Sequence, residues 1–338
     1  MFSENGVVNA SSLVVRSARD HLLYVRPAAA VEPSMYAGKV ETTVLTMIGD
    51  LYNVSATDIV NKRAFFRACT GFNEQWRMND EVLDEVRYTT DPVTVVDLQE
   101  IPVNHKYAGR MGTGRNGMDI ALQSTLQLIP GRDPESRSRR DRIEGLLYQY
   151  TEKVVETANN PQYHQGDILS YPIALQAKQD ITGHLGETGA ELYATLLGLP
   201  EDQRAIEFFG QLSTAMQFGD DYLDWRKDWR DFSTRKAEVA EQLRSGENLL
   251  LATLEENSDE KDACAEVLFD TKKRAAVWFE RLAPDVADLF RHRFQTQLDQ
   301  LPAHPRGESL KQIASLTFNN LLYRAPESPN WFARWAKY

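Results

Sequence analysis

The chain has 338 residues, a formal net charge of −11 and a pI of about 5.2, so we expect no binding to nucleic acid or to an anionic membrane surface. Cys69 and Cys264 are its only cysteines, which excludes a disulfide framework and a cysteine-rich zinc site. It has neither an apolar run of about 18 residues nor a basic-then-apolar leader, so we expect a cytoplasmic protein without an integral membrane segment.

The N-terminal part is predicted to form helices after a loose arm at residues 1–18. One helix covers residues 35–52 and a longer one covers residues 55–88. In the longer helix, apolar side chains recur every three, four or seven residues, which marks a buried stripe: Phe65, Cys69, Phe72, Trp76 and Leu83. Asp80 and Asp84 lie at the edge of this stripe, one turn apart. They form a first acidic motif, which taken alone is a common helical spacing.

The segment from residue 89 to 142 is predicted to be mostly irregular. The glycine-rich run at 109–117 has two readings, a loop or a phosphate cradle, and we favour the loop because it lacks the GK[ST] of a P-loop. A helix at 118–128 is followed by a basic loop at 130–142. Its arginines are expected to solvate the surface, with a rim facing a diphosphate as the alternative. A helix then covers 143–159.

The second half of the chain is predicted to be helical as well. An apolar helix at 168–185 has Lys178 as its only basic residue, and a turn beginning at Gly186 leads to another helix ending at Leu199. A helix that starts at residues 200–202 runs into the segment 216–228. Two or three amphipathic helices follow over 237–301, then one over 309–323 and a tail at 325–338. No stretch alternates like a half-buried strand, so we predict one large all-α domain over residues 1–338.

The segment 216–228 carries a second acidic motif. At about 100° per residue, its polar side chains fall within an arc of roughly 100°: Gln217, Asp220, Asp221, Asp224 and Asp228. Carboxylates this close repel one another unless a cation lies against them, and carboxylate-only sets suit Mg²⁺. The alternative is a solvated acidic face. We favour the metal, because the apolar run before the motif indicates a partly buried helix face.

Together these motifs resemble those of the isoprenoid synthase superfamily, specifically trans-isoprenyl diphosphate synthases and class I terpene synthases. DEVLD at 80–84 is similar to their first aspartate-rich motif, with Glu81 in place of the second aspartate, and QFGDDYLD at 217–224 is similar to the second. Asp80 and Asp220 are 140 residues apart, and Lys178 stands 42 residues before Asp220, as that family leads one to expect. The resemblance implies a single helical bundle with a central active-site cavity.

The resemblance also implies which residues form the site. Three Mg²⁺ ions would bind the diphosphate of a prenyl substrate, held by Asp80, Glu81, Asp84, Asp220, Asp221, Asp224 and Asp228. The residues of direct catalytic importance would be Asp80, Asp84, Asp220, Asp224 and Lys178. The substrate would contact Lys178, Gln217, Arg235 and Lys236 at its diphosphate and Phe72, Asn73 and Trp76 along its chain. Trp76, one turn before Asp80, would act as a pocket floor and favour substrates of ten or fifteen carbons. A homodimer is one assembly consistent with the resemblance.

Some positions depart from the pattern of the chain-elongating enzymes. Thr89 and Thr90 stand where paired arginines are expected, and Thr42 and Gln179 replace an arginine and a threonine. Because guanidinium groups are the bidentate ligands of phosphate, the second diphosphate site is expected to be lost. We therefore predict a terpene synthase that ionises one prenyl diphosphate. One alternative is a prenyltransferase that condenses two isoprenoid diphosphates. It is favoured by Lys178, which stands where terpene synthases usually have an arginine. The other alternative is a non-catalytic partner subunit of an active synthase.

Overall fold

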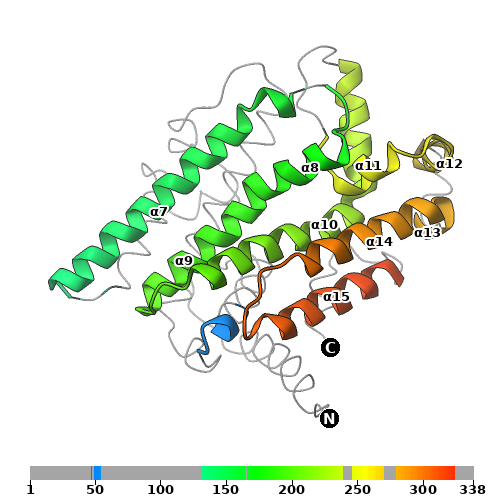
Figure 1. Cartoon of the computed structure of the whole chain (residues 1–338). Helices are drawn as coiled ribbons and strands as arrows, with labels where there is room; N and C mark the ends of the chain where they lie inside the picture. Colours follow the sequence, from blue (N-terminus) through cyan, green and yellow to red (C-terminus); the bar gives the residue numbers. More distant parts are fainter. Residues whose placement is uncertain are drawn as a thin grey trace, which may run out of the picture.

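The computed structural model describes residues 47, 49–54, 129, 131–164, 166–238, 246–269 and 279–323. For residues 231, 235–238, 267–269 and 320–323 it describes the backbone only. This part of the chain is helical (Figure 1). Its helices are α7 (Pro134–Ala158), α8 (Tyr171–Lys178), α9 (His184–Leu197), α10 (Gln203–Glu238), α11 (Leu249–Leu254), α12 (Ser258–Phe269), α13 (Phe279–Leu282), α14 (Pro284–Asp299) and α15 (Gly307–Tyr323), with a 3-10 turn η2 (Pro161–Tyr163) and a π-helical turn η3 (Gln179–Gly183).

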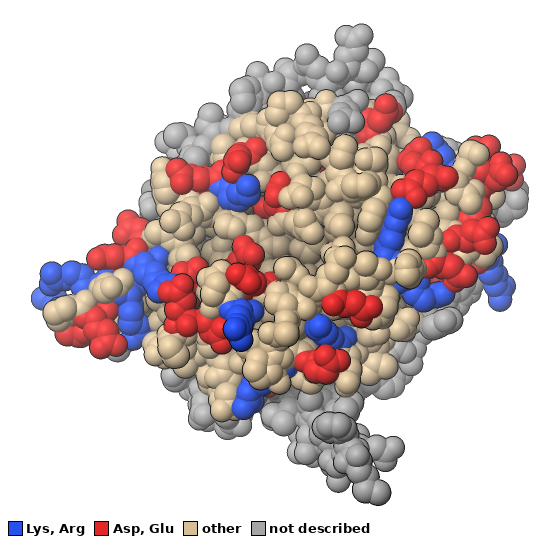
Figure 2. Space-filling model, in the orientation of Figure 1, with Lys and Arg blue, Asp and Glu red and all other residues tan. Residues whose placement is uncertain are grey.

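The prediction of an all-α fold is confirmed for the described residues. They contain no strand, and their one isolated bridge joins Ile168 to Gly246. None of the described helices is both long and apolar enough to cross a membrane. On the face shown in Figure 2, charged side chains of both signs lie at the left and right sides and across the lower middle, and uncharged residues cover much of the upper middle, so no charge of one sign dominates there.

Helix α10 is the centre of the packing. It contacts α9, α11, α14 and α15, while α7 packs on the far side of α9, so these helices form one layered bundle (Figure 1). Phe218 of α10 is fully buried, and its ring lies 5.0 Å from that of Phe290 on α14 and 6.4 Å from that of Phe318 on α15. This aromatic cluster fixes α10 against the two C-terminal helices and so orients the acidic segment that follows Phe218.

Close packing of small residues joins α10 to η3 and α9. A Cβ atom added at Gly183 would lie 2.8 Å from Thr214 Oγ1, and one added at Gly186 would lie 2.8 Å from Ser213 Cβ, with Ser213 Oγ closer still. Neither position can take a larger side chain without moving its neighbour. The predicted turn beginning at Gly186 is wrong, because α9 continues through this residue. The glycine there serves close helix packing and not a change of chain direction.

The predicted basic loop at 130–142 is also wrong over most of its length, because α7 begins at Pro134. Asp133 caps the helix by accepting hydrogen bonds from Ser136 N at 2.9 Å and from Ser136 Oγ at 2.7 Å, and proline is suited to the first helical turn. Arg139 donates to Thr195 O at 2.9 Å and to Leu196 O at 2.5 Å. This arginine therefore caps the C-terminal end of α9 and does not merely solvate the surface.

Candidate active site

The acidic stripe on α10 is graded in its burial. Asp220 and Asp224 are exposed, Gln217 and Asp228 are half-buried, and Asp221 is buried. This order follows their angular order around the helix, because Asp220 and Asp221 lie at opposite edges of the arc. The stripe is therefore neither wholly solvated nor wholly buried. One edge faces solvent and the other packs into the protein.

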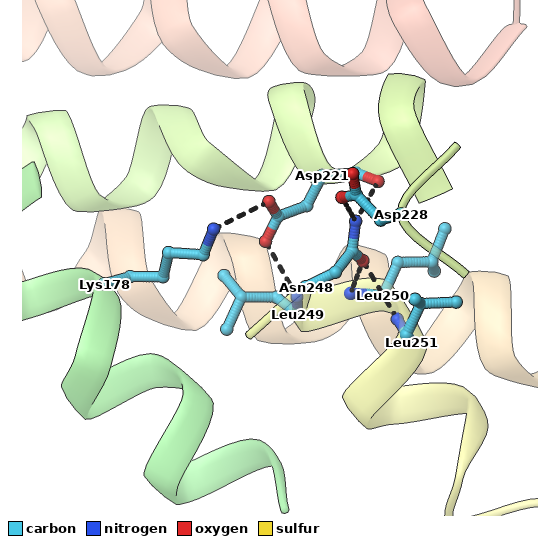
Figure 3. A network of polar contacts seen from close by, with 7 residues as sticks. All are labelled: Lys178, Asp221, Asp228, Asn248, Leu249, Leu250 and Leu251. Atoms are coloured by element: carbon cyan, nitrogen blue, oxygen red, sulfur yellow. Dashed lines mark hydrogen bonds and ion pairs between the residues drawn. The ribbon is translucent and has the colours of Figure 1, made fainter. Parts of the chain in front are cut away.

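Asp221 binds Lys178 at the buried edge. Lys178 Nζ lies 3.0 Å from Asp221 Oδ1, and the backbone N–H of Leu249 donates to Asp221 Oδ2 at 2.7 Å. Figure 3 shows the lysine reaching from the end of α8 toward α10, with the start of α11 beside them. Two predicted site residues that are 43 positions apart thus meet directly. Both carboxylate oxygens of Asp221 are engaged inside the protein, so it is the least suited of the four aspartates to hold a metal.

The burial of this pair changes its proton affinities. Burial raises the pKa of Asp221 to about 7, although the Lys178 ammonium and the Leu249 N–H act in the opposite direction. Burial by itself lowers the pKa of Lys178, but the carboxylates of Asp221, Glu247 and Asp228 outweigh it and the pKa lies above its usual value. The lysine therefore stays charged, and the ammonium is surrounded by acidic groups.

Asn248 is a member of this network that the sequence analysis missed. Its Nδ2 lies 2.7 Å from Asp228 Oδ2 and 2.9 Å from the backbone carbonyl oxygen of Asp221 (Figure 3). Its Oδ1 accepts hydrogen bonds from Leu250 N and Leu251 N, both at 3.0 Å, and so caps α11. An asparagine before the apolar run LLLATL is a helix-start signal that the sequence does contain.

The solvent-facing edge of the stripe offers the carboxylates best placed for a cation. Asp224 lies at the surface, yet neighbouring protein atoms partly desolvate its carboxyl group and Asp228 repels it, and both effects raise its pKa. Asp220 is exposed one turn earlier. Carboxylate oxygens suit Mg²⁺, so Asp220 and Asp224 fit this ion chemically. Within the described ranges, no group of three or more His, Cys, Asp or Glu side chains is arranged to hold a metal by itself.

Other predicted site residues lie outside the described residues. These are Phe72, Asn73, Trp76, Asp80, Glu81 and Asp84, together with the glycine-rich run at 109–117. Arg235 and Lys236 belong to the last turns of α10, but their side chains are not among those described. That Asp80 and Asp224 lie close enough to share the Mg²⁺ ions of one site therefore stays a prediction.

A surface hollow of about 550 Å³ lies elsewhere, at the start of α10. It is lined by Leu51, residues 201–204 and residues 304–306. Asp220 is 17 positions after Gln203 on the same helix, which at 1.5 Å per residue corresponds to roughly 25 Å. This hollow is therefore separate from the acidic stripe, and it is not the central cavity expected from the sequence.

Comparison with known proteins gave similarity to solved structures only. No protein-family model matches the chain, and no curated protein matches it by sequence. The chain is similar to a crystal structure of geranylgeranyl pyrophosphate synthase, with a TM-score of 0.45 and 16% identity over 96% of this chain and 100% of that one. For geranylgeranyl pyrophosphate synthetase from the archaeon Geoglobus acetivorans the TM-score is 0.43, with 14% identity over 94% and 99%. For polyprenyl synthetase from Streptomyces coelicolor A3(2) it is 0.41, with 14% identity over 94% and 98%.

Proposed function

We propose that this chain is a Mg²⁺-dependent enzyme that acts on prenyl diphosphates and that it condenses two isoprenoid diphosphates as a prenyltransferase. The observation that carries the proposal is the contact between Lys178 and Asp221. The sequence resemblance requires the lysine and the second aspartate-rich motif to border one site. The structure brings these two elements together from α8 and α10, although they are far apart in the chain.

The proposal gives the α10 aspartates different tasks. Asp220, Asp224 and the half-buried Asp228, with Asp80 and Asp84 of the first motif, would hold Mg²⁺. When bound, Mg²⁺ would neutralise the charge that develops on the departing diphosphate. Lys178 would add a hydrogen-bond donor to a diphosphate oxygen, since an ammonium has three donors and only one is directed at Asp221. A count of three ions per site follows from the resemblance.

One observation favours condensation over ionisation of a single substrate: Lys178 occupies the place of the arginine that is usual in terpene synthases. In a condensation, the allylic C–O bond breaks with its electron pair leaving on the diphosphate. The double bond of the second substrate then attacks the carbocation, and a proton is lost.

A class I terpene synthase is the second candidate, and a specific observation favours it. Thr89 and Thr90 stand where the resemblance leads one to expect the paired arginines of a second diphosphate site. A hydroxyl group cannot replace a guanidinium in bidentate binding of phosphate. If the second site is lost, the carbocation would cyclise or react with water instead of being extended.

Product analysis separates these candidates. The purified protein is incubated with Mg²⁺ and geranyl, farnesyl or geranylgeranyl diphosphate, each with and without isopentenyl diphosphate. A prenyltransferase yields longer diphosphates only when isopentenyl diphosphate is present, whereas a terpene synthase yields hydrocarbon or alcohol from one substrate alone. If the folded protein, incubated with Mg²⁺, releases no diphosphate either with or without isopentenyl diphosphate, the proposal of a prenyl diphosphate enzyme is wrong.

A further inference from the structure

Asn248 uses the full hydrogen-bonding capacity of its side-chain amide. Its oxygen accepts from two backbone N–H groups, Leu250 and Leu251, and its nitrogen donates to two oxygens, Asp221 O and Asp228 Oδ2. The residue is 4% exposed. A buried amide with both donors and both acceptor sites satisfied has one fixed orientation, because flipping the amide would place donors against donors.

The position of Asn248 relative to α10 is itself fixed on both sides. Before it, Gly246 N donates to Asp167 O at 3.1 Å and Leu169 N donates to Gly246 O at 3.0 Å. These two hydrogen bonds hold Gly246 against the segment that leads into α8. After it, Leu249 N donates to Asp221 Oδ2. The amide therefore reaches Asp228 from a backbone that is held independently of Asp228.

We propose that Asn248 is a positioning residue that holds Asp228 in place and thereby orders the metal-facing end of the aspartate stripe; this rests on the proposed function. Asp228 is half-buried and follows Asp224 by one turn, close enough for its charge to raise the pKa of Asp224, so the placement of this carboxylate acts directly on its neighbour. The amide donor engages Oδ2 of Asp228 and directs the carboxylate. Hydrogen-bond partners of metal-binding carboxylates commonly affect metal affinity by 10- to 100-fold when they are removed.

The chemistry of the site requires an amide and not only a helix cap. Serine and threonine also cap helices, but neither carries the two N–H donors that reach Asp221 O and Asp228. Asn248→Ser therefore keeps a capping group at the start of α11 and removes the contact with Asp228. Asn257 provides a matched control, because its Oδ1 caps α12 by accepting from Glu260 N at 3.0 Å and its substitution leaves the stripe untouched.

The test measures metal binding directly and so does not depend on turnover. Binding of Mn²⁺, as a spectroscopic stand-in for Mg²⁺, is followed by electron paramagnetic resonance with inorganic diphosphate present, for the wild type, Asn248→Ser and Asn257→Ser. We expect the dissociation constant to rise about tenfold in Asn248→Ser and to be unchanged in Asn257→Ser. In turnover assays, Asn248→Ser should need more Mg²⁺ for half-maximal rate and recover most of its kcat at saturating Mg²⁺.

Each remaining outcome counts against one claim or both. If the wild type binds Mn²⁺ and Asn248→Ser binds it equally well, Asn248 only caps α11, and the proposed function stands. If the wild type binds no Mn²⁺ with diphosphate, the proposed function fails and the positioning role fails with it. Should Asn248→Ser lose its cooperative melting, Asn248→Thr is measured in its place. Loss of folding in both variants would show that Asn248 is a structural residue.

Discussion

The ammonium of Lys178 lies 3.0 Å from the carboxylate of Asp221, and this contact joins α8 to α10 at the edge of the acidic stripe. Asp221 is buried and Lys178 is largely so, with side-chain exposures of 4% and 17%. Removing one member of such a pair leaves the other charge in a poorly solvated place. Each member of the pair is therefore needed to compensate the charge of the other, and removal of either one alone should destabilise the fold.

Lys178→Met should destabilise the protein by about 3–5 kcal/mol, because Asp221 would remain buried without its cation. Urea unfolding measures the loss. Lys153→Met is the control, since Lys153 pairs with Glu156 at 3.1 Å on the surface and such pairs are worth about 0–1 kcal/mol. The double variant Lys178→Met/Asp221→Leu should regain much of the lost stability. Equal losses in the Lys178 and Lys153 variants would contradict a buried pair.

The stability of the protein should depend on the protonation of Asp221. Its pKa is about 7 in the folded protein against an ordinary value of 3.8, so the folded state binds the proton more tightly. The contribution of this group is fully present below about pH 4 and is lost as the pH rises through about 7. We therefore expect the melting temperature of the wild type to fall between pH 5 and pH 8 through this group.

Asp221→Asn provides the comparison for this pH dependence. The variant removes the titrating carboxyl group, while Glu247 and Asp228 remain to raise the pKa of Lys178. The fall of the melting temperature between pH 5 and pH 8 should therefore be smaller in the variant than in the wild type. Melting temperatures of both proteins at pH 5, 6, 7 and 8 test this. Parallel curves would show that Asp221 does not titrate in this range.

Asp220→Asn and Asp224→Asn should each lower turnover by about a hundredfold or more, because each removes a proposed metal ligand where charge develops on the leaving group. Both side chains are exposed, so neither substitution should lower the melting temperature measurably. Asp262→Asn, at an exposed position of α12, should leave both quantities unchanged. Full activity in both α10 variants would remove the acidic stripe from the site.

Gly186→Ala should destabilise the protein by about 1–3 kcal/mol, because the new Cβ atom would press against Ser213 on α10. Gly145→Ala should have the opposite effect. Gly145 lies inside α7, where an added Cβ atom would point into open space, and alanine in a helix interior is favoured by about 0.5–1 kcal/mol. Thermal melts of the two variants distinguish steric crowding from helix propensity. A gain in stability at both positions would contradict the close approach of α9 and α10.

The sequence was sufficient to predict the helical class and the position of the central helix. The absence of strand alternation, the predicted helix start at residues 200–202 and the apolar run before the acidic motif all indicate α10, and in the structure Asp202 Oδ1 accepts a hydrogen bond from Arg204 N at 3.1 Å. A helical projection also grouped the four aspartates correctly. It could not tell which edge of the arc faces the protein, because that depends on Lys178 and Leu249, which belong to other elements.

Long-range partners explain the elements that were predicted wrongly or missed. Arg139 and Arg142 were predicted to be solvated loop residues. In the structure they bind partners on α9, Thr195 O and Glu191, which lie about 50 or more positions later in the chain. Asn248 carried a local helix-start signal, but its contact with Asp228 comes from a residue 20 positions earlier. A local pattern can identify a cap. It cannot identify the second partner of the same side chain.

The π-helical turn η3 determines the rotation of Lys178, the last residue of α8, relative to the side chains of α9. A π turn accommodates one more residue than the α-helical turn it replaces, so the side chains before it are rotated relative to those after it. If the same residues, Gln179–Gly183, formed regular α-helix instead, Lys178 would be rotated by about 100° relative to Gly186. The glycine contact with α10 and the ammonium contact with Asp221 could then no longer be made together. The extra residue in the π turn therefore allows one continuous helical segment to make both contacts, that of Lys178 with Asp221 and that of Gly186 with α10.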